Sequence, residues 1–165
     1  PAGQPPHKPA ADRTPGAHRL AMLRLALGER EDAAICTWEL DRSGPSYTYR
    51  TVEALADHLG PSATLRLLIG ADMALIFDKW ARPAVIERRA EPVVMIRPPH
   101  DRRSLLRRLS ADPWASRLVE VPPIDISSTD LRRRLAEHGV EDPAVRAALP
   151  AAVMEYIAAH RLYGG

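Results

Sequence analysis

The segment IDISSTDLRRRL, residues 124–135, has the residue types and spacing that could bind a phosphate group. Ser127 and Asp130 stand three residues apart, as in the capping box that begins many helices. A helix beginning there gathers backbone N–H groups, hydroxyl groups and the positive end of the helix dipole at one place, which favours an anion. Arg132, one turn into the helix, offers phosphate a planar fork of donors. An ordinary capped helix with a solvated arginine face explains the same spacing.

The motif ISSTxxR, residues 126–132, resembles a signature of the nucleotidyltransferases that make the dinucleotide NAD, and especially of the bacterial nicotinate mononucleotide adenylyltransferases. Four further segments resemble this family in the same order: PPHK, GPSYT, IGAD with Trp80, and RPP. The C-terminal stretch LPAAVMEYIAAHRLY is similar to the family's closing LPxxVxxYIxxHxLY. The resemblance implies transfer of AMP from ATP to nicotinate mononucleotide, giving deamido-NAD and pyrophosphate in NAD biosynthesis, with Mg²⁺ accompanying ATP.

The resemblance also implies roles for particular residues. Lys8 and Arg132 would stabilise the phosphates as catalytic groups. The expected ATP-binding residues are Asp72, Ile126, Ser127, Ser128, Thr129 and Arg132. The expected residues for nicotinate mononucleotide are His7, Thr48, Trp80 and Arg97.

Three of these residues have a structural role that competes with the functional one. Thr48 is, with Ser46, a candidate N-cap for the helix that follows, and Asp72 could equally cap a helix. Trp80 is of a residue type that is more often found in the core than in a ligand site. Asp72 also has a physical argument for function, because ligands of open α/β sheets bind beyond the carboxyl ends of strands.

Strands that alternate with helices predict an α/β fold, a Rossmann-like doubly wound parallel sheet of the nucleotidyltransferase type. Apolar runs predict strands at residues 33–40, 65–69, 92–96 and 117–121. Helices are expected near residues 18–27, 52–59, 102–109, 143–148 and 149–163, and residues 124–135 are expected to form a phosphate-binding loop that leads into a further helix. The length of 165 residues suits a single nucleotidyltransferase domain over residues 1–165, in which residues 1–16 are an active-site loop or a disordered leader.

Family members begin with a strand, a GGTFDPxHxGH turn, a helix and a second strand, and this unit precedes the PPHK segment. The sequence here starts after it, and no histidine lies in an HxGH context. We therefore expect a fragment, a truncated reading of a gene, or a remnant that binds nucleotide without catalysis, and the activity of the chain as given stays open.

Composition limits the other classes of function. The net charge is +2 and aromatic residues are 5%, which gives little support to a nucleic-acid-binding domain despite the arginine clusters. Cys36 is the only cysteine, so an intrachain disulfide and a multi-cysteine zinc site are excluded. With no long apolar run and no signal peptide, we expect a cytoplasmic protein without membrane contact, and a homo-oligomer is left open. A sister adenylyltransferase acting on nicotinamide mononucleotide or phosphopantetheine remains an alternative.

Overall fold

The computed structural model describes residues 1–3, 14–109, 114–122 and 126–164. The chain divides into two compact units. Unit 1 comprises residues 1–45 and 125–165, and unit 2 comprises residues 46–124. In the described part of the chain, no helix has the length and apolar character needed to cross a membrane.

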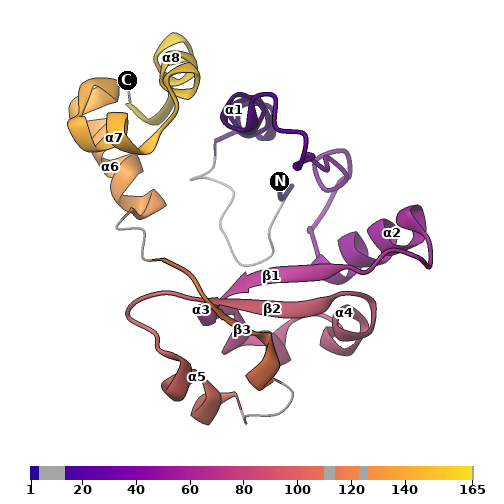
Figure 1. The fold of residues 1–165 in the computed structure, drawn as a ribbon. Coiled ribbons are helices and arrows are strands. Elements are labelled where there is room, and N and C mark those ends of the chain that lie inside the picture. Colours follow the sequence, from indigo (N-terminus) through magenta and orange to yellow (C-terminus); the bar gives the residue numbers. More distant parts are fainter. Residues whose placement is uncertain (4–13, 110–113, 123–125, 165) are drawn as a thin grey trace. The chain divides into compact units, whose positions relative to one another are not determined.

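Unit 2 is built on a parallel sheet in the order β1-β2-β3 (Figure 1), formed by Arg66–Gly70, Glu91–Ile96 and Leu118–Glu120. Ile69 pairs with Val94, and Val94 with Leu118, so these apolar side chains share one face of the sheet. Strands this rich in Ile, Val and Leu are typical of buried parallel sheets. The α/β architecture and all three of these strands were predicted from the sequence and are confirmed.

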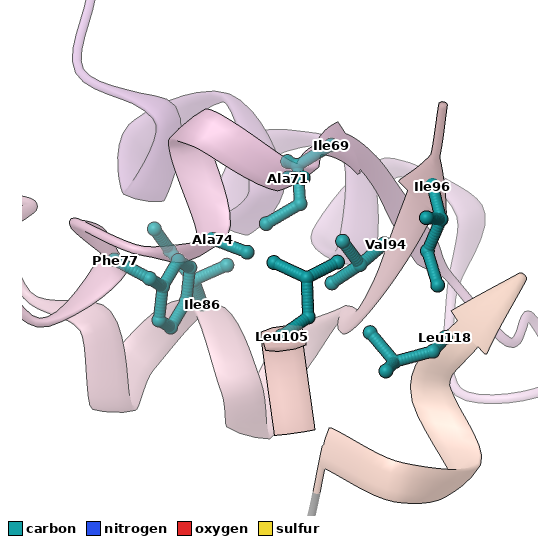
Figure 2. Packing of buried hydrophobic residues seen from close by; sticks show 9 residues of the cluster. All are labelled: Ile69, Ala71, Ala74, Phe77, Ile86, Val94, Ile96, Leu105 and Leu118. Carbon is teal, nitrogen blue, oxygen red and sulfur yellow. The ribbon is translucent and has the colours of Figure 1, made fainter. Parts of the chain in front are cut away.

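Short helices cover that face of the sheet (Figure 2). They are α3 (Ala71–Ala74), the 3-10 turn η1 (Phe77–Lys79), α4 (Pro83–Arg89) and α5 (Arg102–Arg108), with α2 (Thr48–Leu59) packed against α4 and η2 (Trp114–Arg117) leading into β3. Ile86 and Val94 are fully buried in this core, and Leu105 is 1% exposed. The core therefore fixes where each strand ends, and with it the position of the loops that follow.

Unit 1 is helical in its described part. It contains α1 (Gly16–Leu27), α6 (Ser128–His138), η3 (Gly139–Glu141), α7 (Pro143–Ala148), α8 (Ala151–Ala159) and η4 (Leu162–Gly164). Its core consists of Leu135, Val145, Val153 and Ile157. The expected C-terminal helix is confirmed as α8, which buries Val153 and Ile157, and Pro150 stands just outside it as its N-cap.

One predicted strand is wrong. Residues 33–37 have no regular structure, and residues 38–40 form a turn. The turn is closed by the backbone N–H groups of Leu40 and Asp41, which donate to Thr37 O at 2.7 and 3.1 Å. The Thr37 hydroxyl donates to Asp41 at 2.7 Å, so local hydrogen bonds take the place of a strand ladder.

The predicted cap of α2 is also wrong. Tyr47, with φ −87° and ψ 126°, precedes the helix as its N-cap, and its side chain accepts no capping hydrogen bond. Thr48 is the first helical residue. The Tyr47 ring instead stacks on that of Tyr49, with the centroids 6.0 Å apart.

Candidate active site

The helix α6 begins as its sequence predicts. Ser127 is the N-cap, in an extended conformation, and its hydroxyl oxygen accepts a hydrogen bond from the Asp130 N–H at 3.0 Å. Ser127, Ser128 and Thr129 are all exposed, as is Ile126. The capping part of the prediction is confirmed. The start of α6 is exposed to solvent, and an exposed helix N-terminus favours an anion.

The three consecutive arginines of α6 differ in their partners. Arg133 and Arg134 donate to the Asp130 carboxylate at 2.6 and 2.8 Å, and Arg134 also lies 3.3 Å from Asp142. Hydrogen bonds from Arg134 and then Arg133 hold the pKa of the Asp130 carboxyl below its usual range. Arg132 is exposed and has no hydrogen bond or ion pair with another described residue. Its guanidinium is therefore available to a phosphate.

Arg132 and Ser128 also border a cavity of about 370 Å³ in unit 1. Arg19 from α1 adds a second cation, and the remaining wall is mainly apolar. Most of that wall comes from Met22, Leu23, Ala26, Leu131, Leu135, Leu149, Pro150, Val153 and Ile157. A volume of this size lies in the range of small-molecule sites.

In unit 2, Asp72 and Arg97 follow neighbouring strands. Asp72 lies in α3 directly after β1, and Arg97 comes directly after β2. Because β1 and β2 are parallel and adjacent, their carboxyl ends lie at one edge of the sheet. The expected placement of Asp72 beyond the end of a strand is confirmed. Arg97 is exposed, and the N-cap of α3 is Gly70, so Asp72 does not cap that helix.

A residue that the sequence did not single out meets Asp72. His100 Nε2 lies 2.8 Å from Asp72 Oδ1. The His100 side chain is 22% exposed, whereas that of Asp72 is 77% exposed, so the imidazole is the anchored member of the pair. The turn after β2 brings His100 there, closed by its N–H donating to Arg97 O at 3.0 Å. The sequence does contain an indication of His100, because this residue follows β2 and stands three positions after Arg97.

Two of the residues expected to bind nicotinate mononucleotide, Thr48 and Trp80, lie on two segments of unit 2 that are in contact. Tyr49, next to Thr48, and Trp80 both pack against the same core cluster. Trp80 is half-buried, with its ring centroid 5.3 Å from that of Phe77. The guanidinium of Arg82 lies 5.0 Å from the centroid of the Tyr49 ring. The packing role of Trp80 is thus observed, and part of its surface remains open to solvent.

His7 and Lys8 lie outside the described residues. Within the described residues, the ISST segment belongs to unit 1, and Thr48, Asp72, Trp80 and Arg97 belong to unit 2. The roles that the sequence implies for these side chains stay predictions.

Known proteins resemble both the sequence and the fold. The model of the cytidylyltransferase-like family matches residues 1–134. A probable nicotinate-nucleotide adenylyltransferase of Roseiflexus sp. (strain RS-1) is 39% identical over 99% of this chain and 80% of its own length. One from Symbiobacterium thermophilum is 40% identical, over 99% of this chain and 78% of its own length.

Solved structures give the same fold at low sequence identity. A Plasmodium falciparum nicotinic acid mononucleotide adenylyltransferase complexed with NaAD superposes with a TM-score of 0.69 at 16% identity, covering 98% of this chain and 78% of its own. The same kind of enzyme from Plasmodium falciparum complexed with APC gives 0.65 at 17% identity, covering 91% and 76%. The predicted nucleotidyltransferase fold is confirmed, and this chain belongs to the cytidylyltransferase-like family, among the nicotinate-nucleotide adenylyltransferases.

Proposed function

We propose that this chain transfers AMP from ATP to nicotinate mononucleotide, giving deamido-NAD and pyrophosphate. The relatives named for this activity match nearly the whole chain. In the structure, the observation that carries the proposal is the state of Arg132. This arginine lies near the start of α6, is exposed and has no partner among the described residues. The two arginines that follow it, Arg133 and Arg134, do have partners. An arginine left without a carboxylate partner beside exposed hydroxyl groups is suited to a polyphosphate.

On the ATP side, residues 126–129 and Arg132 would hold the triphosphate, with Lys8 as a second cation. The exposed backbone and hydroxyl groups at the start of α6 favour negative charge there. Asp72 would accept hydrogen bonds from ribose hydroxyls through the carboxylate oxygen that His100 leaves free. Its 77% exposure supports this role.

On the acceptor side, Trp80 would stack on the pyridine ring, and Thr48 would donate to the nicotinate carboxylate. His7 and Arg97 would contact the rest of the mononucleotide. The contact between Arg82 and Tyr49 supports this assignment, because it joins the segment after Trp80 to the segment after Thr48.

The reaction needs an in-line attack of the mononucleotide's phosphate oxygen on the α-phosphorus of ATP, with pyrophosphate leaving as the new P–O bond forms. The protein's part is to align the two substrates and to stabilise the developing charge. Mg²⁺ bound to ATP would neutralise part of the phosphate charge, held mainly by phosphate oxygens and water. No set of three or more His, Cys, Asp or Glu side chains in the described residues could hold a metal ion, and an ion carried by ATP needs none.

The remaining expectations stay predictions. The family match over residues 1–134 runs through both compact units, which supports one nucleotidyltransferase domain over residues 1–165. A cytoplasmic location and a homo-oligomer are also still predictions.

The test is pyrophosphate release from ATP and Mg²⁺ with three acceptors side by side: nicotinate mononucleotide, nicotinamide mononucleotide and phosphopantetheine. We expect release with the nicotinate acceptor. Release with phosphopantetheine alone would assign the chain to a sister activity. ATP binding without release for any acceptor would instead favour a nucleotide-binding remnant.

A further inference from the structure

Two arginines and two tyrosines gather beside Thr48 in unit 2. The Arg82 guanidinium lies over the Tyr49 ring at 5.0 Å from its centroid. Arg50 lies 5.7 and 5.8 Å from the Tyr47 and Tyr49 centroids, and its Nε donates to the Tyr49 hydroxyl at 3.1 Å. A guanidinium stacked on an aromatic face keeps the N–H groups at its edge free for a planar acceptor such as a carboxylate.

Among the described residues, no carboxylate balances the charge of this cluster. Neither Arg50 nor Arg82 forms an ion pair with any carboxylate in the described residues. By contrast, helices α2 and α4 do share one ion pair, in which Arg89 of α4 lies 3.4 Å from Asp57 of α2. Exposed arginines are usually free to pair with solvent ions, but Arg82 is held in place by the ring beneath it.

The backbone at Arg82 supports a positional requirement for this side chain. Arg82 has φ 53° and ψ 56°, the left-handed region that residues with a Cβ rarely adopt. Such conformations persist where surrounding structure fixes them, and they cluster at ligand-binding positions. Here the residue stands between Trp80, whose ring packs on the core, and Pro83, which begins α4.

We propose that Arg82 recognises the carboxylate of the acceptor and so selects nicotinate mononucleotide over nicotinamide mononucleotide. The inference rests on the proposed function, and it deepens that function by naming the group that separates the two acceptors. The two mononucleotides differ only in a carboxylate or an amide on the pyridine ring. An arginine fork gains two charge-assisted hydrogen bonds with the carboxylate, whereas the amide is neutral and offers one acceptor.

The test is calorimetric binding of both mononucleotides to the chain and to three variants. In Arg82→Gln we expect the Kd for nicotinate mononucleotide to rise roughly 10-fold to 100-fold, the effect of losing a hydrogen bond to a charged group. Binding of nicotinamide mononucleotide should change by less than about twofold, because its amide carries no charge for the arginine to pair with. Arg82→Lys, which keeps the charge and loses the fork, should fall between these values. Arg89→Gln, at the C-terminal end of the helix that Arg82 precedes, is the matched control and should leave the ratio of the two Kd values unchanged.

The outcomes separate this inference from the proposed function. A chain that binds nicotinate mononucleotide more tightly than the amide, with the same ratio in Arg82→Gln, overturns the role of Arg82 and leaves the proposed function standing. A chain that binds neither mononucleotide overturns both. Equal weakening of both ligands in Arg82→Gln would mark a structural role, and thermal unfolding of the same samples would show it directly.

Discussion

His100 Nε2 lies 2.8 Å from Asp72 Oδ1, and this contact joins the residues that follow two adjacent parallel strands. The imidazole is mostly buried and the carboxylate is mostly exposed. A half-buried imidazole that contacts one oxygen of an exposed carboxylate restricts the direction of the other oxygen. We therefore expect His100 to position a carboxylate at the sheet edge where open α/β sheets bind ligands.

Loss of His100 should weaken ATP use without stopping the reaction. In His100→Ala we expect the KM for ATP to rise roughly 2-fold to 10-fold, the effect of one ordinary hydrogen bond, with kcat little changed. His100→Asn, which keeps a donor, should recover part of the loss. A fall in kcat with no change in KM would contradict a role through Asp72.

Arg132 should matter for ATP far more than the arginine next to it. Arg132→Ala should raise the Kd for ATP roughly 10-fold to 100-fold and leave thermal unfolding nearly unchanged, because the side chain has no described partner to lose. Arg133→Ala is the matched control, since Arg133 is already paired with Asp130 and Glu137 on the same helix. Equal ATP binding by the two variants would remove Arg132 from the phosphate site.

Ser127 allows its capping role to be separated from a phosphate role. Ser127→Ala should lower the free energy of unfolding by about 0.5–2 kcal/mol through loss of the cap. Ser127→Asp should restore that stability, because aspartate is an equally good N-cap and its charge favours a helix start. It should nevertheless bind ATP more weakly than Ser127→Ala, because the new carboxylate repels phosphate. Tight ATP binding by Ser127→Asp would place the phosphates elsewhere.

The acid side of the stability profile should depend on Asp130 and Asp142. Hydrogen bonds from Arg134 and Arg133 lower the pKa of Asp130. At Asp142 burial opposes ionisation, but the N–H groups of Val145 and Ala144 and the Arg134 guanidinium outweigh it, so that its pKa is also lowered. The unfolded chain then binds more protons than the folded chain at acid pH, and stability rises with pH through this range.

This stabilisation should be complete above the unfolded carboxyl pKa near 4 and should be lost as the pH falls through the lower folded values. Urea unfolding at a series of pH values measures it. Asp130→Asn should flatten the acid slope of stability against pH, because it removes the carboxylate that Arg133 and Arg134 hold. An unchanged slope in Asp130→Asn would show that the ion pairs with Arg133 and Arg134 do not persist in solution.

The core of unit 2 should be sensitive at Ile86, which is fully buried among the sheet and the helices that cover it (Figure 2). Ile86→Ala should cost about 2–5 kcal/mol, the range for removing a large apolar side chain from a packed core. Leu59→Ala, at a half-exposed position on α2, is the control and should cost much less. Similar losses for both variants, measured by urea unfolding, would contradict this packing.

The sequence predicted the parts of the molecule that depend on local pattern. The apolar runs of β1 and β2 mark buried parallel strands, and Ser127 with Asp130 marks the start of α6. The segment of residues 33–40 has the same apolar character but no strand partner in the described residues, and Thr37 bonds to Asp41 instead. A pattern of side chains cannot show whether a partner strand is present.

Contacts between residues that are far apart in the chain could not be predicted from the sequence. His100 contacts Asp72 because β1 and β2 lie side by side. Their paired residues, such as Arg66 and Glu91, are 25 positions apart in the sequence. Arg82 meets Tyr49 because α4 packs against α2. The resemblance to a family named Asp72 and Trp80, but the contacts of His100 with Asp72 and of Phe77 with Trp80 became visible only in three dimensions.

The most direct test of the proposed function is the identity of the product formed from ATP, Mg²⁺ and nicotinate mononucleotide. We expect mass spectrometry to find deamido-NAD in one-to-one ratio with pyrophosphate, and at least tenfold less product with Arg132→Ala at limiting ATP. Pyrophosphate without deamido-NAD, or deamido-NAD formed equally well by Arg132→Ala, would contradict the proposed reaction or its phosphate site, respectively.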